Sequence, residues 1–391
     1  MIKWLKVWLI SWVLINTAWA DDLTTKQLIQ TSVKEFMQVN GVPGAAVLLY
    51  KNGKISSYYF GYAVPKKHIL VSENTIFEIG SITKTFTGLL FAENIADGKM
   101  QLTDPAIDYL PFKTSNAFHQ ISLLNLATHT SSLPYSATGL AYNTANSTTH
   151  KLALEKFLAS WQLPYPIGSQ MLYSNLGFGL LGDTLANAAH TSLADLMEQT
   201  ILKPLGMLSA GLDLNSIQKK NLAQGFTAAG QPAKPNPSGL FAGAWAMKAS
   251  PKDMQAYLLA VLDAPGTPAT IAKAMQIAET PYYGLAQYSL QLGLGWMMTP
   301  LDSEENIIHL INQPRYRQIS SHDAQKLLSP IFNRNALIDK TGTTLGFRAY
   351  IAIIPKTNTG IVILINRSIA ASGALPNLAN SLLFKTSGLI K

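Results

Sequence analysis

Both ends of this chain carry a pair of strand-like segments, and this feature constrains the fold more than any other. Toward the N-terminus, residues 45–50 (AAVLLY) and 54–62 flank an Asn-Gly dipeptide, which is typical of a type I′ hairpin turn. Toward the C-terminus, residues 348–354 (RAYIAII) and 361–365 (IVILI) are apolar and rich in β-branched side chains. The simplest fold places all of these segments in one antiparallel sheet.

Helices are predicted on either side of that sheet and in the middle of the chain. Residues 23–39 carry an apolar stripe at helical spacing, and residues 371–389 are predicted to form a closing helix. Between about 100 and 235, helix signals such as the capping box at Ser192 alternate with Pro- and Gly-containing loops. The predicted fold class is α/β, of the α+β kind: an antiparallel β-sheet flanked by helices, with an inserted mostly helical domain.

The domain boundaries follow from this order of elements. Residues 21–100 and 235–391 are expected to form a discontinuous α/β sheet domain, and residues 101–234 the helical domain. Because small-molecule sites favour the junctions between such units, we expect a site in the cleft where the two meet.

The first twenty residues have the pattern of a secretory signal. Lys3 and Lys6 precede the apolar residues 7–15, and Ala-Trp-Ala at 18–20 is an A-x-A type cleavage site. The apolar run is shorter than the ~20 residues that a membrane-spanning helix needs. We expect residues 1–20 to be removed and the mature chain to be periplasmic, without a membrane anchor; the alternative is a retained N-terminal anchor.

Composition excludes several classes of protein. The chain has no cysteine, which excludes a disulfide framework, a thiolate nucleophile and cysteine-bound zinc. Its net charge of +8 is scattered, with no block of five basic residues, so we do not expect nucleic-acid binding. Charged residues make up 13%, against about 25% in average domains, which argues against disorder. A mildly basic exported enzyme fits these numbers.

Three short motifs occur in order along the chain and together indicate catalysis by a serine. Ser81-x-x-Lys84 comes first, Tyr173-x-Asn175 follows, and a Lys-Thr-Gly motif begins at Lys340. Each motif alone is weak, because S-x-x-K recurs at residues 216–219 and Y-x-N at residues 50–52. Their order, spacing and local context together favour a functional interpretation.

Ser81 and Lys84 have the residue types and the spacing of an activated nucleophile. A serine hydroxyl is a poor nucleophile at neutral pH and needs an adjacent base. Positions i and i+3 share one helix face, so Lys84 can reach the Ser81 hydroxyl from one turn along. Gly80 allows close backbone approach at a helix N-terminus, where negative charge is favoured. The Ser81 N–H is a candidate oxyanion donor.

Tyr173 is the candidate base for this serine. An isolated tyrosine has a pKa of about 10. We predict that the ammonium groups of Lys84 and Lys340 favour the phenolate and lower the pKa of Tyr173. Asn175, on the same short segment, is predicted to hold Lys84 and to bind a substrate amide.

The third motif is predicted to bind substrate. Lys340 and Thr341 can bind a carboxylate, and Gly342 leaves room for a substrate lying against the strand 348–354. His129 could in principle be the base of a catalytic triad. We instead expect it to be a polar residue near the cleft wall or a hydrogen-bonded histidine in the interior.

Taken together, these motifs and their surroundings resemble the class C serine β-lactamases over nearly the whole exported chain. The similar segments are FEIGSITKTFTG, LLNLATHTSSLP, YPIGSQMLYSNLGFGLLG, LKPLGM, LGLGWMM, DKTGTTLGFRAYIAIIP and GIVILINR. Class A enzymes carry S-D-N in place of the tyrosine motif, and a glutamate for the deacylating water. The tyrosine motif also occurs in DD-peptidases and esterases of this fold, so those chemistries stay open.

The resemblance implies a role for each catalytic residue. Ser81 would be acylated by the β-lactam ring, while Lys84 and Tyr173 would take up and transfer the proton of the Ser81 hydroxyl. Tyr173 would then help to activate the hydrolytic water. Lys340 would position the substrate beside them.

The resemblance also implies the substrate contacts. Asn175 would position the substrate, and Thr341 would lie near its carboxylate. The N–H groups of Ser81 and Thr343 would form the oxyanion hole. Neither a metal nor an organic cofactor is implied.

Several positions depart from the usual class C pattern. Ser136 stands where a glutamine is usual after Leu-Pro, and Asp339 precedes the Lys-Thr-Gly motif where histidine is common. Trp245 stands where a tyrosine usually lines the pocket for the acyl side chain. After Asn366-Arg367 the usual Asn-Pro-x-Arg run is absent. Ser136 and Trp245 are therefore expected at an altered substrate-binding edge.

The expected function is that of a periplasmic serine hydrolase that opens β-lactam rings through a covalent acyl-serine and thereby gives resistance to β-lactam antibiotics. The chain is expected to act as a monomer on this small molecule, with no nucleic-acid or membrane partner. A D-Ala-D-Ala carboxypeptidase or esterase of the same fold is the first alternative. A non-catalytic penicillin-binding sensor is the second.

Overall fold

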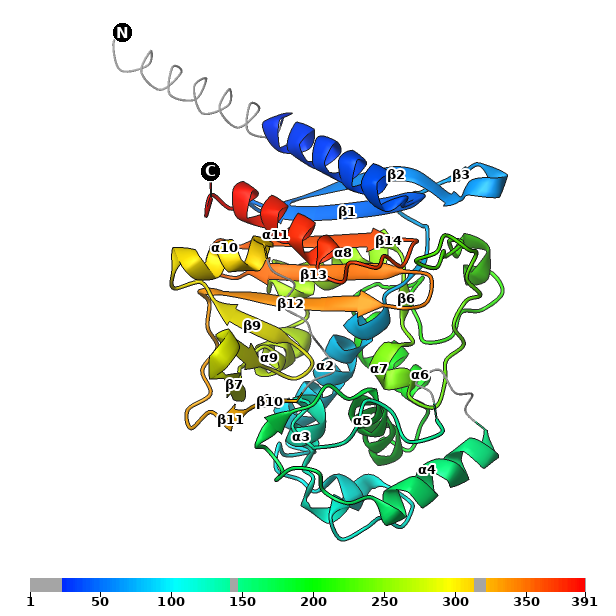
Figure 1. The fold of residues 1–391 in the computed structure, drawn as a ribbon, viewed down its shortest axis with the longest axis vertical. Helices are drawn as coiled ribbons and strands as arrows, with labels where there is room; N and C mark the ends of the chain where they lie inside the picture. Colours follow the sequence, from blue (N-terminus) through cyan, green and yellow to red (C-terminus); the bar gives the residue numbers. More distant parts are fainter. Residues whose placement is uncertain (1–22, 141–146, 313–320, 391) are drawn as a thin grey trace.

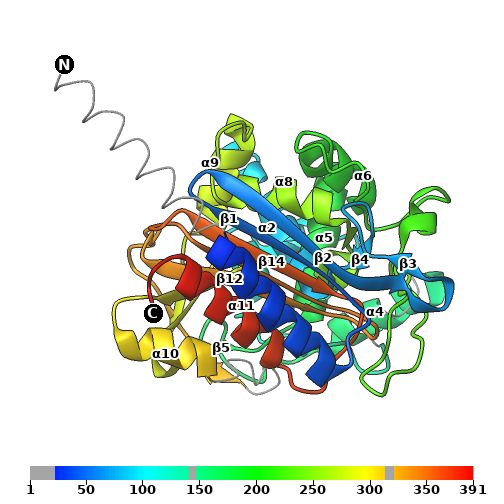
Figure 2. The same cartoon turned by 90° about the horizontal axis from the view of Figure 1, so that it is seen from above.

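The computed structural model describes residues 23–140, 147–312 and 321–390 of the chain. The expected signal segment, residues 1–20, lies outside these described ranges. Within them, no helix is both long enough and apolar enough to cross a bilayer. A central sheet has helices on both faces (Figure 1). In the view from above, the helix of residues 23–40 and α11 (Ala374–Thr386) lie side by side across the sheet (Figure 2).

Both ends of the chain do join one sheet. Within the described residues ten antiparallel strands follow the order β11-β7-β8-β9-β12-β13-β14-β1-β2-β3. The ends meet where Ala45 of β1 lies opposite Ile365 of β14. This confirms the predicted fold class. The strands are β1 (Gly44–Lys51), β2 (Lys54–Val64), β3 (Ile69–Leu70), β7 (Tyr283–Leu285), β8 (Leu290–Leu292), β9 (Met297–Pro300), β11 (Gln325–Lys326), β12 (Ala336–Thr343), β13 (Arg348–Ile354) and β14 (Thr359–Ile365).

The hairpin between β1 and β2 forms as its turn residues predict. Asn52 and Gly53 have φ angles of 55° and 76°, and both central residues of a type I′ turn need positive φ. The apolar run of β1 is explained by burial on both of its faces. Leu48 packs into the core on one side of the sheet, and Leu49 packs into the core on the other.

Helices cover the two faces of this sheet. The helix of residues 23–40, α10 and α11 lie on one face (Figure 2), and their apolar side chains form one core with the strands. On the other face α8 packs on β1 and β14. Its N-cap Ser250 accepts a hydrogen bond from Asp253 N, and a proline occupies the first helical position. The helices are α2 (Thr83–Ala96), α3 (Leu123–Ala127), α4 (Thr148–Ser160), α5 (Asn175–Ala188), α6 (Leu193–Met197), α7 (Ala242–Trp245), α8 (Pro251–Val261), α9 (Ala269–Ala278), α10 (Glu304–Asn312) and α11 (Ala374–Thr386).

The central helix α2 links the sheet to the helical middle of the chain. It packs against α5, α7 and α9, and a short 3-10 turn, η2 (Gly80–Ile82), leads into it beside β12. One continuous core extends from the sheet into this helical region. The division into domains at residues 100 and 235 stays a prediction.

Two small sheets and one short helix complete the middle of the chain. The first sheet pairs β4 (Phe77–Glu78) with β6 (Lys248–Ala249), and the second pairs β5 (Gln170–Met171) with β10 (His322–Asp323). Ser192 caps α6 by accepting a hydrogen bond from Asp195 N, as its capping box predicts. The chain then continues as a π-helical turn, Glu198–Leu202, before Pro204.

Candidate active site

A cavity of about 540 Å³ opens between the end of β12 and the N-terminal ends of α2 and α5. The residues that line it include members of all three sequence motifs: Ser81, Tyr173, Asn175, Thr341 and Thr343. These residues lie up to 262 positions apart in the chain, or 343 minus 81, so the fold alone brings them together. Lys84 and Lys340 are buried behind the cavity wall.

Ser81 lies in η2, immediately before α2, at the helix N-terminus that the sequence predicts. Gly80 has a φ of 52°, which favours glycine. A Cβ at this position would lie 2.5 Å from Thr343 N, closer than real side-chain contacts allow. The missing side chain therefore lets the backbone around Ser81 lie directly against Thr343.

Lys84 is fully buried and makes three hydrogen bonds. Its Nζ donates to Ser81 Oγ (3.3 Å), to Asn175 Oδ1 (2.7 Å) and to the carbonyl oxygen of Ala244 (2.7 Å). Burial lowers the pKa of Lys84 well below its usual value, and the nearby charge of Lys340 lowers it further. A lysine with a lowered pKa readily loses one proton, and the neutral amine can then keep the bonds to Asn175 and Ala244 and accept the proton of Ser81.

Tyr173 lies between the two lysines, but its acidity differs from the sequence prediction. Lys340 Nζ is 3.5 Å from Tyr173 Oη, and the Lys84 Nζ is 4.8 Å from the tyrosine ring centre. Burial raises the pKa of Tyr173 above its usual value, outweighing a hydrogen bond to Ser81 that lowers it. The prediction of a lowered pKa was wrong because desolvation disfavours the phenolate, and burial also lowers the pKa of Lys340, to about 8.

His129 supports Tyr173 from behind, a role that the sequence did not reveal. Its ring stacks on Tyr173 at 4.2 Å between centroids, and its Nδ1 accepts a hydrogen bond from Ser174 N (3.1 Å). Burial, with Lys340 and Lys84 nearby, lowers the pKa of His129 well below its usual value. His129 is thus a buried, neutral ring, which agrees with the predicted interior histidine. Its packing against Tyr173 was not predicted.

Gly342 has a different role from the one expected. A Cβ on Gly342 would lie 1.9 Å from the carbonyl oxygen of Ile79 and 3.3 Å from Ile82. The glycine therefore lets the segment that carries Ser81 pack on β12, and it is this segment, not substrate, that occupies the space. Thr341 and Thr343, on either side of it, do line the cavity.

Replacing Gly342 with alanine is expected to destabilise the protein. The new methyl group would force β12 and the residues before Ser81 apart, and overpacking of this kind typically costs ~1–3 kcal/mol. The matched control is Gly284→Ala on β7, where the new Cβ would meet only Leu327, at an ordinary 3.5 Å. Thermal unfolding of both variants checks the prediction, and equal midpoints for the two would contradict it.

The altered edge of the site differs in detail from the sequence prediction. Trp245 lines the cavity, as expected, but at the Leu-Pro loop the lining residue is Tyr135 and not Ser136. Tyr135 also packs near Tyr173, with ring centroids 6.2 Å apart. The carboxylate of Asp339 accepts a hydrogen bond from Tyr350 Oη (2.6 Å), and the same hydroxyl contacts Asn380 of α11. The Asp339 carboxylate therefore faces α11, on the side of the sheet away from the cavity.

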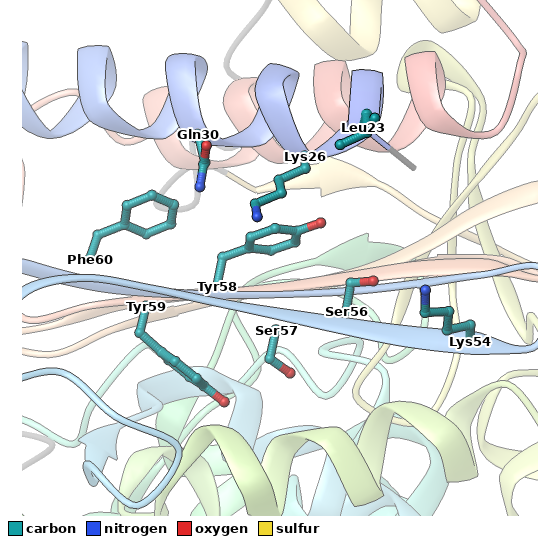
Figure 3. Close-up of a pocket in the computed structure, with 9 residues that line it drawn as sticks. All are labelled: Leu23, Lys26, Gln30, Lys54, Ser56, Ser57, Tyr58, Tyr59 and Phe60. Carbon is teal, nitrogen blue, oxygen red and sulfur yellow. The ribbon is translucent and has the colours of Figure 1, made fainter. Parts of the chain in front are cut away.

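A second cavity, of about 570 Å³, lies between the helix of residues 23–40 and β2. Figure 3 shows that its residues do not converge on one point. Tyr58 and Phe60 point toward the helix, whereas Ser57 and Tyr59 point to the opposite face of β2. The cavity around Ser81 is therefore the better candidate for chemistry.

Known proteins match this chain over most of its length. A family model described as Beta-lactamase matches residues 29–382. A beta-lactamase of Pseudomonas fluorescens is 32% identical over 347 residues, which cover 88% of this chain and 94% of that protein. A beta-lactamase of Psychrobacter immobilis is 32% identical over 369 residues, covering 92% of this chain and 88% of that protein.

Solved structures match the fold as well. A class C beta-lactamase in complex with cefoxitin superposes with a TM-score of 0.84 and 29% identity, covering 93% of this chain and 99% of that one. Another class C beta-lactamase structure gives the same TM-score, identity and coverage. The likeness therefore extends over the sheet and the helices together.

Proposed function

This chain belongs to the beta-lactamase family, and on that premise we propose that it hydrolyses β-lactams through a covalent acyl-enzyme on Ser81. Its resemblance to the class C enzymes is confirmed by the solved structures that it matches. The observation that carries the proposal is the contact of the buried Lys84 amine with Ser81 Oγ, at 3.3 Å, on the wall of the cavity.

The proposed first step is acylation. Ser81 Oγ attacks the carbonyl carbon of the β-lactam ring, and its proton passes to the neutral amine of Lys84. The backbone N–H groups of Ser81 and Thr343 donate to the oxyanion that forms, which fits the close packing of these two segments. Collapse of the intermediate breaks the ring C–N bond, and the nitrogen takes a proton through the hydroxyl of Tyr173, which Lys84 re-protonates.

The proposed second step is hydrolysis of the acyl-enzyme. A water molecule attacks the ester carbonyl and gives its proton to the Tyr173 and Lys84 pair. The ester C–O bond breaks, and Ser81 Oγ leaves with a proton from the same pair. The raised pKa of Tyr173 supports this role, because a phenol that keeps its proton can relay one between Lys84 and the reacting atom.

Other parts of the site are proposed to hold the substrate. Asn175 lies on the cavity wall, where its Oδ1 accepts a hydrogen bond from Lys84 and its side chain also hydrogen-bonds Tyr135. Its amide N–H₂ is proposed to bind a substrate amide. Thr341 and Lys340 are proposed to act near the substrate carboxylate. Trp245 is proposed to line the pocket for the acyl side chain. We further propose a periplasmic, monomeric enzyme that confers resistance to β-lactam antibiotics.

Mixing the mature protein with a chromogenic cephalosporin is expected to give sustained, many-turnover hydrolysis. A penicillin, a D-Ala-D-Ala peptide and a simple ester serve as comparison substrates under the same conditions. A rapid burst followed by almost no steady-state turnover, with fast hydrolysis of the peptide or ester, would instead identify a peptidase or esterase. Acylation without turnover of any of the four would identify a penicillin-binding sensor.

A further inference from the structure

One end of the cavity departs from the usual class C sequence pattern. The Asn-Pro-x-Arg run usual after residue 367 is absent, and Ser368 and Ser372 line the cavity there instead. A different cation is present on the same wall: Arg348, the first residue of β13. Arg348 lies directly opposite Thr343 in the register of β12 and β13, which places the two residues side by side.

Arg348 is a half-buried cation with no counter-charge among the residues that the structure describes. Its Nη2 donates to the carbonyl oxygen of Ile369 (2.7 Å), and its Nε is buried with no hydrogen-bond partner among the described residues. It forms no ion pair with any described residue, and the cavity lining includes no aspartate or glutamate. Burial lowers the pKa of Arg348, although an arginine keeps its proton in proteins. A partly desolvated charge of this kind is costly unless an anion pairs with it.

Neutral hydroxyl groups line the same cavity as the Arg348 side chain. Thr341, Thr343 and Thr344 come from the end of β12 and the residue after it, and Ser368 and Ser372 come from the loop beyond β14. The Thr344 hydroxyl is buried with no hydrogen-bond partner among the described residues. A guanidinium beside hydroxyl donors, with no competing acid, suits a carboxylate better than a neutral or cationic group.

Lys340 is less well placed for this task. Its Nζ is directed at Tyr173, 3.5 Å away, and Lys340 is only 1% exposed. Lys340 therefore contacts a proton-transfer group and does not line the cavity, whereas Arg348 lies on the cavity wall.

We propose that Arg348 binds the carboxylate of the β-lactam substrate and thereby determines specificity for anionic substrates. The inference rests on the proposed function, because it names the group that holds the substrate of that same site. One N–H of Nη2 stays with the carbonyl oxygen of Ile369 and fixes the guanidinium plane, while the remaining N–H groups of Nη1 and Nη2 bind the ligand. The hydroxyls of Thr341 and Thr343 complete the subsite.

The test compares a fluorescent penicillin with its methyl ester, which has the same ring but no carboxylate. The second-order rate of acylation of Ser81 is measured for both compounds, so the result does not depend on turnover. For Arg348→Gln we expect the rate with the acid to fall about 10–100-fold, the loss typical of a charge-assisted bidentate contact. The rate with the ester is expected to change less than about 3-fold, so that the preference for the acid collapses.

Two further variants make the comparison specific. Arg348→Lys keeps the charge without the planar fork, and is expected to retain part of the preference for the acid. Arg334→Gln removes another arginine that donates to a backbone carbonyl, that of Pro355, and does not line the cavity, so its preference should match the unaltered protein. Thermal unfolding of each variant confirms that it is folded.

The outcomes are separable. Equal losses with the acid and the ester in Arg348→Gln would assign Arg348 a structural role at the Ile369 loop and overturn the inference. An unchanged preference for the acid would overturn it as well. If the unaltered protein is acylated by neither compound, the proposed function itself fails, which is a different result from failure of the Arg348 variants alone.

Discussion

Replacing Ser81 with alanine is expected to abolish covalent labelling by penicillins and to reduce cephalosporin turnover to the uncatalysed level. Ser81 Oγ is the nucleophile proposed for the first bond-forming step, and it lies 3.3 Å from the Lys84 amine. The substitution should leave the fold intact, because Lys84 keeps its hydrogen bonds to Asn175 Oδ1 and to the carbonyl of Ala244. Intact-mass spectrometry after incubation with a penicillin measures the labelling.

The chain provides its own control for this experiment. Ser216 begins a second S-x-x-K sequence, but it is exposed and does not line the cavity. Ser216→Ala should be labelled and should turn over substrate like the unaltered protein. Labelling that persists in Ser81→Ala would refute the assignment of the nucleophile.

Replacing Lys84 with methionine is expected to slow acylation by ~10²–10⁴-fold, the usual contribution of a general base. Methionine keeps most of the buried stem and removes the amine. The effect on acylation should exceed that of Tyr173→Phe, because burial lowers the pKa of Lys84 and raises that of Tyr173, so the amine is the better proton acceptor near neutral pH. Stopped-flow acylation rates measure both variants.

Tyr173→Phe should slow complete turnover by ~10²–10⁴-fold, and more than it slows acylation alone, because the relay serves the ring nitrogen during acylation and the water during hydrolysis of the acyl-enzyme. The pH dependence has a definite sign. Acylation needs the neutral form of Lys84, so the rate should fall as the pH drops through the pKa of Lys84, which lies well below the usual lysine value. Equal acylation losses in the two variants would return the base role to Tyr173.

Much of the fold follows from local sequence patterns. The β1–β2 turn, the strand Arg348–Ile354, the cap at Ser192 and the contact of Lys84 with Ser81 were all predicted from residues that are neighbours in the chain. The strands β7, β8 and β9 were not predicted. They contain only three or four residues each, which is too short for an alternating pattern to stand out.

The chemistry of the site depended on contacts that no local pattern contains. Gly342 leaves space for the backbone at Ile79 and not for substrate. At the Leu-Pro loop Tyr135 lines the cavity, where Ser136 was expected. Likewise, Arg348 was predicted only as the start of a strand, and its place on the cavity wall is evident only in the structure. Each of these depends on what a distant segment places beside the residue.

The sequence by itself determined which groups this protein uses: a serine and a lysine one helical turn apart, a tyrosine, and a second lysine on a strand. Residue type and short-range spacing are sufficient for that, because helix and strand geometry are local. Only the tertiary structure decided the protonation of these groups. Burial raises the pKa of Tyr173 and lowers that of Lys84, since desolvation depends on how completely the whole chain excludes water from the site.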